Sequence, residues 1–261
     1  MALRLGILNV MPSVAAYEPY LLGPLSHSGL SVEPVWLRLR SHVYKSSDPA
    51  HLERFYRPLD RALAGGALDG LLLTGAPIEH LPFSEVRYWP ELVEILGWAR
   101  AGGVKGTLGI CWGGLALLST VGVPKILYPR KLFGVHRYRA LQPAHPLLAG
   151  GDDEFDCAQS RHGGVDDAEV ERAAREGRVT PLAHGPAGGY VLSETPDHRF
   201  VMHLGHPEYE AARLVHEWRR DREAARTDVD PPHRFDVERP VNTWRAHCTT
   251  LFSSWLSRLA G

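Results

Sequence analysis

The segment Gly109-Ile110-Cys111-Trp112-Gly113 is the strongest chemical signal in the sequence. It follows a short β-rich run and precedes an apolar helical run, which is the arrangement of a nucleophile elbow with cysteine in the place of serine. Glycine two residues before and two residues after the nucleophile would prevent a collision in so tight a turn. The nucleophile would lie at a helix N-terminus, where free N–H groups and the helix dipole favour a thiolate. Cys111 is therefore predicted to be a nucleophile, the alternative being a buried structural cysteine.

A histidine and a glutamate that could serve this cysteine follow a later buried run, Phe200 to Leu204. The sequence there is Gly205-His206-Pro207-Glu208, and loops at strand ends are where α/β sheets carry functional residues. A nucleophilic cysteine needs a base, and the base needs a group that orients it. We predict that His206 is the base and that Glu208 fixes its tautomer and stabilises its cation. The alternative is a surface turn with an ordinary histidine.

Metal and nucleotide cofactors find no support in the sequence. His203 and His206 could suggest a zinc pair, but at this spacing on a strand the two side chains point to opposite faces, so no metal is expected. Neither a Gly-x-x-x-x-Gly-Lys-Ser/Thr loop nor a Gly-x-Gly-x-x-Gly motif after a strand occurs in the chain. We therefore expect no permanently bound cofactor.

The elements that must position these residues alternate in type along the chain. Short β-rich runs are separated by helical patterns, which indicates βαβ units and an α/β fold with a mostly parallel sheet flanked by helices. Pro90 to Arg100 and Trp244 to Leu259 have helical periodicity. We predict a single domain over residues 1–261, with the charged segment 221–240 as a surface excursion. The β-rich runs are Leu3 to Val10, Val32 to Leu39, Leu68 to Thr74, Gly106 to Ile110 and Phe200 to Leu204.

Composition narrows the possible partners. The 29 basic and 30 acidic side chains leave a net charge of −1, so the chain lacks the charge excess of proteins that bind nucleic acid or an anionic membrane. The first ten residues have no pattern of a secretory signal, and no apolar run approaches the about 20 residues that cross a bilayer. The 3 cysteines are too scattered for a disulfide framework. We expect a cytoplasmic protein without nucleic-acid or membrane partners.

Several further motifs occur in order over nearly the whole chain: Asn9-Val10-Met11-Pro12, Thr74-Gly75-Ala76-Pro77, Tyr88-Trp89-Pro90, Ser160-Arg161, Gly205-His206-Pro207-Glu208-Tyr209, Arg220-Asp221 and Trp244-Arg245-Ala246-His247. Together with the elbow, this order resembles the homoserine O-acyltransferases of the homoserine transsuccinylase type, which are similar to class I glutamine amidotransferases. The resemblance implies a flavodoxin-like fold and a homodimer that acts in methionine biosynthesis. It also implies ping-pong acyl transfer from an acyl-CoA to an amino acid hydroxyl, with Cys111 as nucleophile, His206 as base and Glu208 as orienting group.

The resemblance also implies roles for residues around the cysteine. Lys131 and Ser160 would line the substrate pocket, and Arg220 would bind the carboxylate of the acceptor. Each of these three residues would otherwise be a surface or capping residue. An oxyanion hole could come from the backbone N–H of Trp112, with a second donor from the loop Gly75-Ala76.

Glu79 is predicted to select the acyl donor. A glutamate at this place is similar to what acetyl-CoA users of the family carry, whereas a glycine resembles the succinyl-CoA users. A carboxylate here would fill space and repel a second carboxylate, by about 1 kcal/mol in water and about 4 kcal/mol at an effective dielectric constant of about 20. The sequence thus predicts acetyl transfer from acetyl-CoA to homoserine or a related hydroxy amino acid. The alternative is that Glu79 is an exposed loop charge.

A few positions differ from the family's pattern. Ser13-Val14 and Tyr17-Glu18 stand where Lys-Lys and Thr-Glu are usual, and Leu115 stands where a glutamine is common. These changes fall near the acceptor and dimer regions, so serine or another hydroxy amino acid stays open as the acceptor. A succinyl-CoA-dependent homoserine or serine O-succinyltransferase is the alternative within the class. A glutaminase-like amidotransferase or amidase and a catalytically silent binding protein are the alternatives from other classes.

Overall fold

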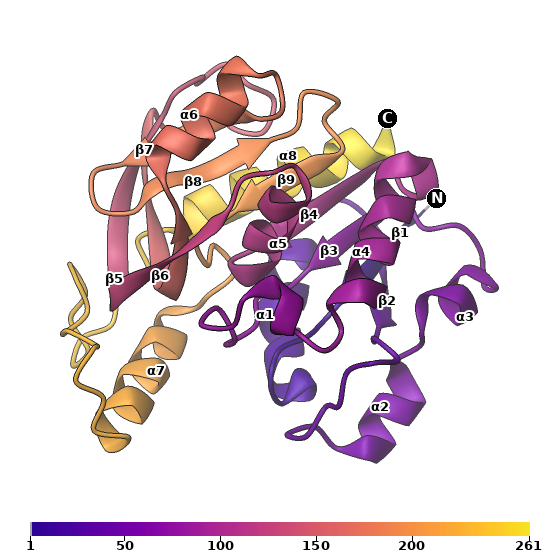
Figure 1. Cartoon of the computed structure of the whole chain (residues 1–261), viewed down its shortest axis with the longest axis horizontal. Helices are drawn as coiled ribbons and strands as arrows, with labels where there is room; N and C mark the ends of the chain where they lie inside the picture. The colour runs from indigo at the N-terminus through magenta and orange to yellow at the C-terminus, as the bar shows by residue number, and fades with distance from the viewer. Residues whose placement is uncertain (1) are drawn as a thin grey trace.

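A mixed nine-stranded sheet lies at the centre of the computed structural model, which describes residues 2–261. Its strands are β1 (Leu3–Leu8), β2 (Val32–Leu37), β3 (Gly70–Leu73), β4 (Gly106–Ile110), β5 (Lys125–Ala140), β6 (Glu154–Val165), β7 (Thr180–Gly185), β8 (Gly189–Glu194) and β9 (Phe200–His203). The strand order is β2-β1-β3-β4-β9-β8-β7-β5-β6. Pairing is parallel from β2 to β9 and antiparallel from β9 to β6. The parallel half lies to the right and the antiparallel half to the left in Figure 1.

Helices flank both faces of the parallel half. The helices of residues 2–261 are α1 (Val14–Ser26), α2 (Pro49–Phe55), α3 (Leu59–Leu63), α4 (Trp89–Trp98), α5 (Trp112–Thr120), α6 (Asp167–Arg175), α7 (Ala211–Glu223) and α8 (Arg245–Ala260), with short turns η1 (Phe83–Glu85) and η2 (Ala99–Gly103). Of these, α6 lies over β7 and β8 of the antiparallel half (Figure 1). Leu72 of β3 packs in one core cluster with residues of α1 and α8, whereas Leu71 and Leu73 pack in another with residues of α4 and α5. Successive strand residues point to opposite faces, so the strand is buried on both sides.

The predicted α/β class is confirmed, and the predicted elements of the parallel half are present. The five β-rich runs correspond to β1, β2, β3, β4 and β9, and the two predicted helices correspond to α4 and α8. The sheet is parallel in this half and antiparallel beyond it. β7 and β8 are joined by residues 186–188 alone, and so short a connection permits antiparallel pairing but no parallel crossover.

The segment 221–240 differs from its predicted description at its start. Residues 221–223 are the last residues of α7, and Asp221 is buried. The helix gives a weak sequence signal because Glu217 and Asp221 occupy buried positions that apolar residues usually fill. Lys131 of β5 compensates both carboxylates. Residues 224–240 have little regular structure, and His233 pairs with Gly134 of β5.

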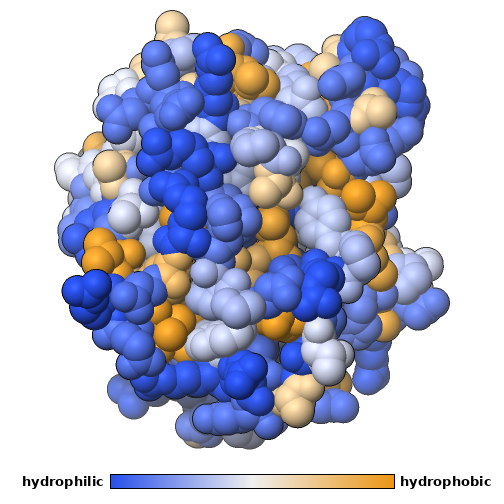
Figure 2. Space-filling view, turned by 90° about the vertical axis from the view of Figure 1, so that its left-hand side faces the viewer, coloured by the Kyte–Doolittle hydropathy of each residue, from blue (hydrophilic) through white to orange (hydrophobic). Residues whose placement is uncertain are grey.

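The outer surface of the antiparallel half is predominantly hydrophilic. Figure 2 views the molecule from the side that lies at the left of Figure 1, and apolar side chains gather there in small groups among polar ones. Across residues 2–261, no helix combines the length and apolar character that a membrane crossing requires.

The turn from β4 into α5 places Cys111 at the edge of the sheet. Cys111 has a φ of 52° and a ψ of −114°, a region that residues other than glycine rarely adopt. A Cβ atom on Gly109 would lie 2.6 Å from the carbonyl carbon and oxygen of Gly113, so the collision predicted from the sequence exists at this position. A Cβ atom on Gly113 would lie 2.5 Å from the carbonyl oxygen of Leu73. Gly113 is therefore required by the close approach of α5 to β3.

Gly109→Ala is expected to lower the free energy of unfolding by about 1–3 kcal/mol, because the added methyl group must displace backbone atoms. Gly97→Ala is the matched control, since Gly97 lies in α4 with open space where its Cβ would be. Alanine there should stabilise the helix by about 0.5–1 kcal/mol. Urea unfolding followed by circular dichroism measures both changes. Equal effects at the two positions would contradict the steric account of the turn.

Candidate active site

The carboxyl ends of three neighbouring parallel strands bring the predicted catalytic residues together. Cys111 follows β4, His206 follows β9 and Gly75 follows β3. The N–H of Cys111 donates to the carbonyl of His203, the last residue of β9, at 2.8 Å. A Cβ atom on Gly75 would lie 3.3 Å from Cβ of Cys111 and 3.5 Å from Cε1 of His206. The thiol and the imidazole therefore lie side by side over this glycine.

Glu208 lies where it can orient His206. Its Oε1 accepts a hydrogen bond from Nδ1 of His206 at 2.8 Å and another from the hydroxyl of Tyr17. His206 and Glu208 are both buried, and the ring of Tyr209 stacks on the imidazole with centroids 4.0 Å apart. Because Nδ1 is tied to Glu208, Nε2 is the ring nitrogen left to interact with Cys111.

Neighbouring negative charges keep the His206 imidazole protonated. Burial lowers the pKa of His206, but Cys111 and then Glu208 outweigh it and raise the pKa to about 10. At neutral pH the ring is therefore an imidazolium beside the sulfur of Cys111. Of the raising influences, the charge of Cys111 is the largest.

A cavity of about 560 Å³ opens onto Cys111 and His206. Cationic, anionic and aromatic side chains all line it, so it can hold a polar ligand against the sulfur. The lining includes five further residues that the sequence analysis assigned to the site, namely Ala76, Glu79, Lys131, Ser160 and Arg220.

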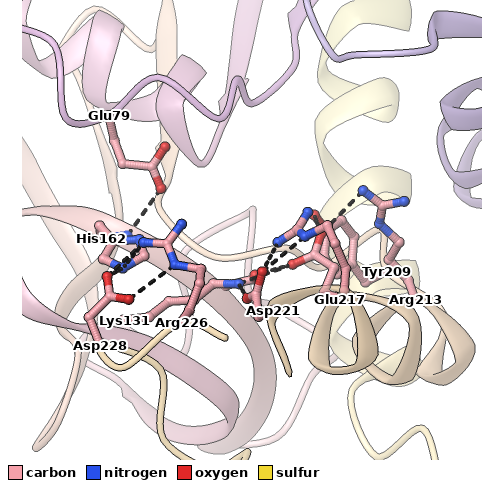
Figure 3. A network of polar contacts seen from close by, with 11 residues as sticks. Glu79, Lys131, His162, Tyr209, Arg213, Glu217, Asp221, Arg226 and Asp228 are labelled. Atoms are coloured by element: carbon pink, nitrogen blue, oxygen red, sulfur yellow. Dashed lines mark hydrogen bonds and ion pairs between the residues drawn. The ribbon is translucent and has the colours of Figure 1, made fainter. Parts of the chain in front are cut away.

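Lys131, Ser160 and Arg220 belong to one polar network with Glu217 and Asp221 of α7. Figure 3 shows Lys131 with these two carboxylates. Nζ of Lys131, buried on β5, donates to Asp221 at 2.7 Å and lies 3.5 Å from Glu217. The hydroxyl of Ser160, on β6, donates to Glu217, and the guanidinium of Arg220 donates to Asp221 at 2.9 and 2.7 Å. The three predicted residues are thus held by two carboxylates of one helix.

Sequence reasoning gave neither of these carboxylates a role. Glu217 and Asp221 are four residues apart, which places them on one face of α7. This spacing would have pointed to the site once the helix was recognised. The antiparallel strands β5 and β6 that supply Lys131 and Ser160 were also not predicted, so the network could not be assembled from the sequence.

Glu79 lies at the other end of the network from α7 in Figure 3. Its Oε1 accepts a hydrogen bond from the backbone N–H of His162 on β6 at 3.1 Å. The ring of His162 and the guanidinium of Arg226 both contact Asp228 nearby. Glu79 is partly buried and lines the cavity. Its carboxylate is therefore attached to the sheet and does not extend freely from a loop.

The predicted oxyanion donors lie beside the sulfur. Trp112 is the first residue of α5, directly after Cys111, while Gly75 contacts Cys111 and Ala76 lines the cavity. The indole of Trp112 packs against an aromatic group that includes Phe83. This packing holds the N-terminus of α5 close to the loop that follows β3.

The residues of a possible metal site near the triad form a hydrogen-bonded cluster of neutral groups. Cys157, His203 and His247 have potential ligand atoms within 4.8 Å of one another. The N–H of Gly205 donates to Nδ1 of His203, so Nε2 of this neutral ring carries the proton and can donate to Nε2 of His247 at 3.0 Å. Burial holds the pKa of His203 well below its ordinary value and lowers that of His247 to about 3. We assign no metal to this cluster.

A second group that could hold a metal lies at the surface. His145, Glu194 and His198 bring one ligand atom each within 4.8 Å of the others. The N–H of Leu147 donates to Nδ1 of His145, which leaves the ring proton on Nε2, where it is donated to Glu194 at 2.8 Å. The carboxylate of Glu194 also accepts from Arg258 at 2.7 Å. These contacts explain the group without a metal: Glu194 of β8 binds His145 and also fixes Arg258 of α8 to the sheet.

A known family matches almost the whole chain. The family model described as homoserine O-succinyltransferase covers residues 1–260. The chain belongs to the homoserine O-succinyltransferase family. A homoserine O-acetyltransferase of Ruegeria pomeroyi is 36% identical over 263 residues, which cover 98% of this chain and 82% of that protein. A homoserine O-acetyltransferase of Bacillus subtilis is 37% identical over 255 residues, covering 96% and 83% of the two chains. The resemblance predicted from the motifs and the assignment to the acyltransferases are confirmed.

Solved structures of glutamine amidotransferases have a fold similar to that of this member of the homoserine O-succinyltransferase family. A glutamine amidotransferase of Thermotoga maritima is similar with a TM-score of 0.64 at 14% identity, covering 99% of this chain and 98% of that chain. One of Methylobacillus flagellatus has a TM-score of 0.64 at 14% identity, with 98% and 94% covered. The likeness is one of fold, and it confirms the predicted class I glutamine amidotransferase-like architecture.

Removal of the sulfur is expected to lower the pKa of His206. In Cys111→Ala it should fall by about 1–3 pH units from about 10, because the nearest negative charge is lost. Titration of ¹⁵N-labelled histidine by NMR measures this, with the signal assigned by its loss in His206→Gln. Glu208→Gln should also lower the pKa, but less than Cys111→Ala. An unchanged titration of His206 in Cys111→Ala would contradict the charge pair.

Proposed function

We propose that this chain transfers an acetyl group from acetyl-CoA to the side-chain hydroxyl of homoserine through an acyl-cysteine at Cys111. The observation that carries the proposal is that Cys111 and the buried His206, whose imidazole is held by Glu208, lie side by side at a cavity lined by cationic side chains. The relatives named homoserine O-acetyltransferase support the acceptor and the acyl group. We further propose, from the family resemblance, that the protein is a cytoplasmic homodimer that acts in methionine biosynthesis.

In the first half-reaction the sulfur of Cys111 attacks the thioester carbonyl carbon of acetyl-CoA. A bond between this sulfur and the acyl carbon forms, the bond to the sulfur of CoA breaks, and the leaving CoA takes the proton from Nε2 of His206. One thioester replaces another, so the acyl group is transferred at nearly equal free energy. The N–H of Trp112 and a donor from the loop Gly75-Ala76 would stabilise the oxyanion.

Acylation prepares His206 for the second half-reaction. The thioester has no charge on the sulfur of Cys111, so the largest influence that raises the pKa of His206 is removed. The neutral imidazole, oriented by Glu208, can then take the proton of the acceptor hydroxyl while its oxygen attacks the acyl carbon. The bond to sulfur breaks, the ester leaves, and the proton taken from the acceptor is again held between His206 and the sulfur of Cys111.

Lys131, Ser160 and Arg220 would form the acceptor end of the cavity, as the family resemblance implies. Lys131 and Ser160 are buried and already fixed by carboxylates of α7, so they can receive a ligand with little loss of side-chain entropy. Arg220 is half-exposed at the end of α7 and would contact the carboxylate of the acceptor from the cavity rim.

Incubation with acetyl-CoA should add one acetyl group to the intact mass of the protein and release free CoA. The adduct should be missing from Cys111→Ala and present in Cys248→Ala, the matched control at another buried free cysteine. Mass spectrometry and a thiol assay measure both products. No adduct from either acetyl-CoA or succinyl-CoA would overturn the proposal. Turnover of glutamine alone would favour the amidase alternative.

The choice of acyl donor is proposed to depend on Glu79. Glu79→Gly should raise the ratio of kcat/KM for succinyl-CoA to that for acetyl-CoA by about tenfold or more, because a repulsion of about 1–4 kcal/mol and the side-chain volume are both removed. Glu79→Gln is the matched control, since it keeps the volume and removes the charge. A change in both variants would identify repulsion as the cause, and a change in the glycine variant alone would identify volume. An unchanged ratio in Glu79→Gly would remove the basis for acetyl selection.

A further inference from the structure

Arg213 lies among three tyrosine rings at the α7 end of the cavity that contains Cys111. Its Cζ is 5.9 Å from the ring centroid of Tyr17, 5.8 Å from that of Tyr20 and 5.6 Å from that of Tyr209. A guanidinium nitrogen lies 3.2 Å from Oε1 of Glu217, the contact drawn in Figure 3. Rings at these distances hold a cation by their quadrupoles and fix its direction.

The cluster around Arg213 contains more cations than carboxylates. Lys131, Arg213 and Arg220 are paired with two carboxylates, those of Glu217 and Asp221. Burial raises the pKa of Glu217, but Lys131, Arg213 and His206 outweigh it and lower the pKa to about 2, so this carboxylate is charged at neutral pH. The cluster is left with one uncompensated positive charge. A carboxylate on a bound ligand would balance it.

Arg213 is the cation of this cluster with a buried donor that lacks a partner. Arg220 donates two hydrogen bonds to Asp221, and Lys131 donates to the same carboxylate. Arg213 instead has its ion pair with Glu217, and its Nε is buried with no hydrogen-bond partner among residues 2–261. A buried donor without a partner costs about 1–3 kcal/mol, and a guanidinium can donate two parallel bonds to one carboxylate. The site is thus prepared for an anionic group.

Arg213 and His206 are also linked through one aromatic ring. Its guanidinium lies over the ring of Tyr209, and the same ring stacks on His206. In homoserine only three carbon atoms separate the hydroxyl oxygen from the carboxylate carbon. A carboxylate on such an acceptor must therefore lie close to the base that takes the hydroxyl proton. Arg220, in the last turn of α7, contacts Asp221 instead.

We propose that Arg213 binds the α-carboxylate of the acceptor, with Tyr17, Tyr20 and Tyr209 holding its guanidinium in place. The inference rests on the proposed acyl transfer and defines the acceptor class as short hydroxy amino acids with a free carboxylate. Arg213 makes the inner contact with this carboxylate, and Arg220 makes the outer contact at the rim.

Discrimination between homoserine and homoserine amide tests the proposal. The wild-type protein should prefer the acid, and the ratio of kcat/KM for acid to amide should fall about tenfold or more in Arg213→Gln. Arg213→Lys should keep part of the preference, because it retains the charge but loses the second donor. Arg220→Gln is the matched control and should lower the ratio less. An unchanged ratio in Arg213→Gln, or a larger loss in Arg220→Gln, would overturn the proposal.

The first half-reaction separates this inference from the proposed function. CoA release and the acetyl adduct do not involve the acceptor, so Arg213→Gln should retain them, which also reports a folded site. If that variant forms no adduct, Tyr20→Leu takes its place, because it removes one of the three rings around Arg213 and leaves the guanidinium. An unchanged acid-to-amide ratio of kcat/KM in Tyr20→Leu would refute the inference. Failure of the wild-type protein to acylate any hydroxy amino acid would refute the proposed function and this inference with it.

Discussion

The backbone N–H of Cys111 donates to the carbonyl of His203, and this hydrogen bond ties Cys111 to the strand that leads to His206. Because β4 lies between β3 and β9, the same edge of the sheet also presents Gly75 to both side chains. The left-handed backbone of Cys111 raises the sulfur above the turn, and Gly109 and Gly113 permit the close approach of the helix behind it. Backbone geometry thus positions the sulfur before any substrate is present.

Charge compensation organises the rest of the site. An isolated buried charge is costly, so each charged group needs a partner. Glu208 receives hydrogen bonds from His206 and Tyr17, and the imidazolium faces the sulfur. On the α7 side, Glu217 is stabilised by Lys131, by Arg213 and also by the charge of His206. The charges around Cys111 and those on α7 are therefore electrostatically coupled through His206.

Local signals predicted the parallel half of the fold and the sharp turn at Cys111. The unbroken apolar run at Leu71 to Leu73 indicated a strand buried on both faces, and the structure shows each face covered by a different cluster. The elbow glycines were predictable because their constraint is steric and lies within a few residues. In contrast, α7 was missed, since Glu217 and Asp221 interrupt its apolar face. Their burial depends on Lys131, which is distant in the sequence. The spacing of apolar residues in α7 therefore does not reveal this partner.

By itself, the sequence determined which residue types could perform covalent chemistry, where the chain turns sharply and to which family it belongs. These properties follow from short-range sterics and from the order of motifs. Only the tertiary structure decided which charged side chains share the cavity with Cys111, because β5, β6 and α7 converge there from separate parts of the chain. It also placed the guanidinium of Arg213 among tyrosine rings, because Tyr17 and Tyr20 reach it only when α1 packs beside α7.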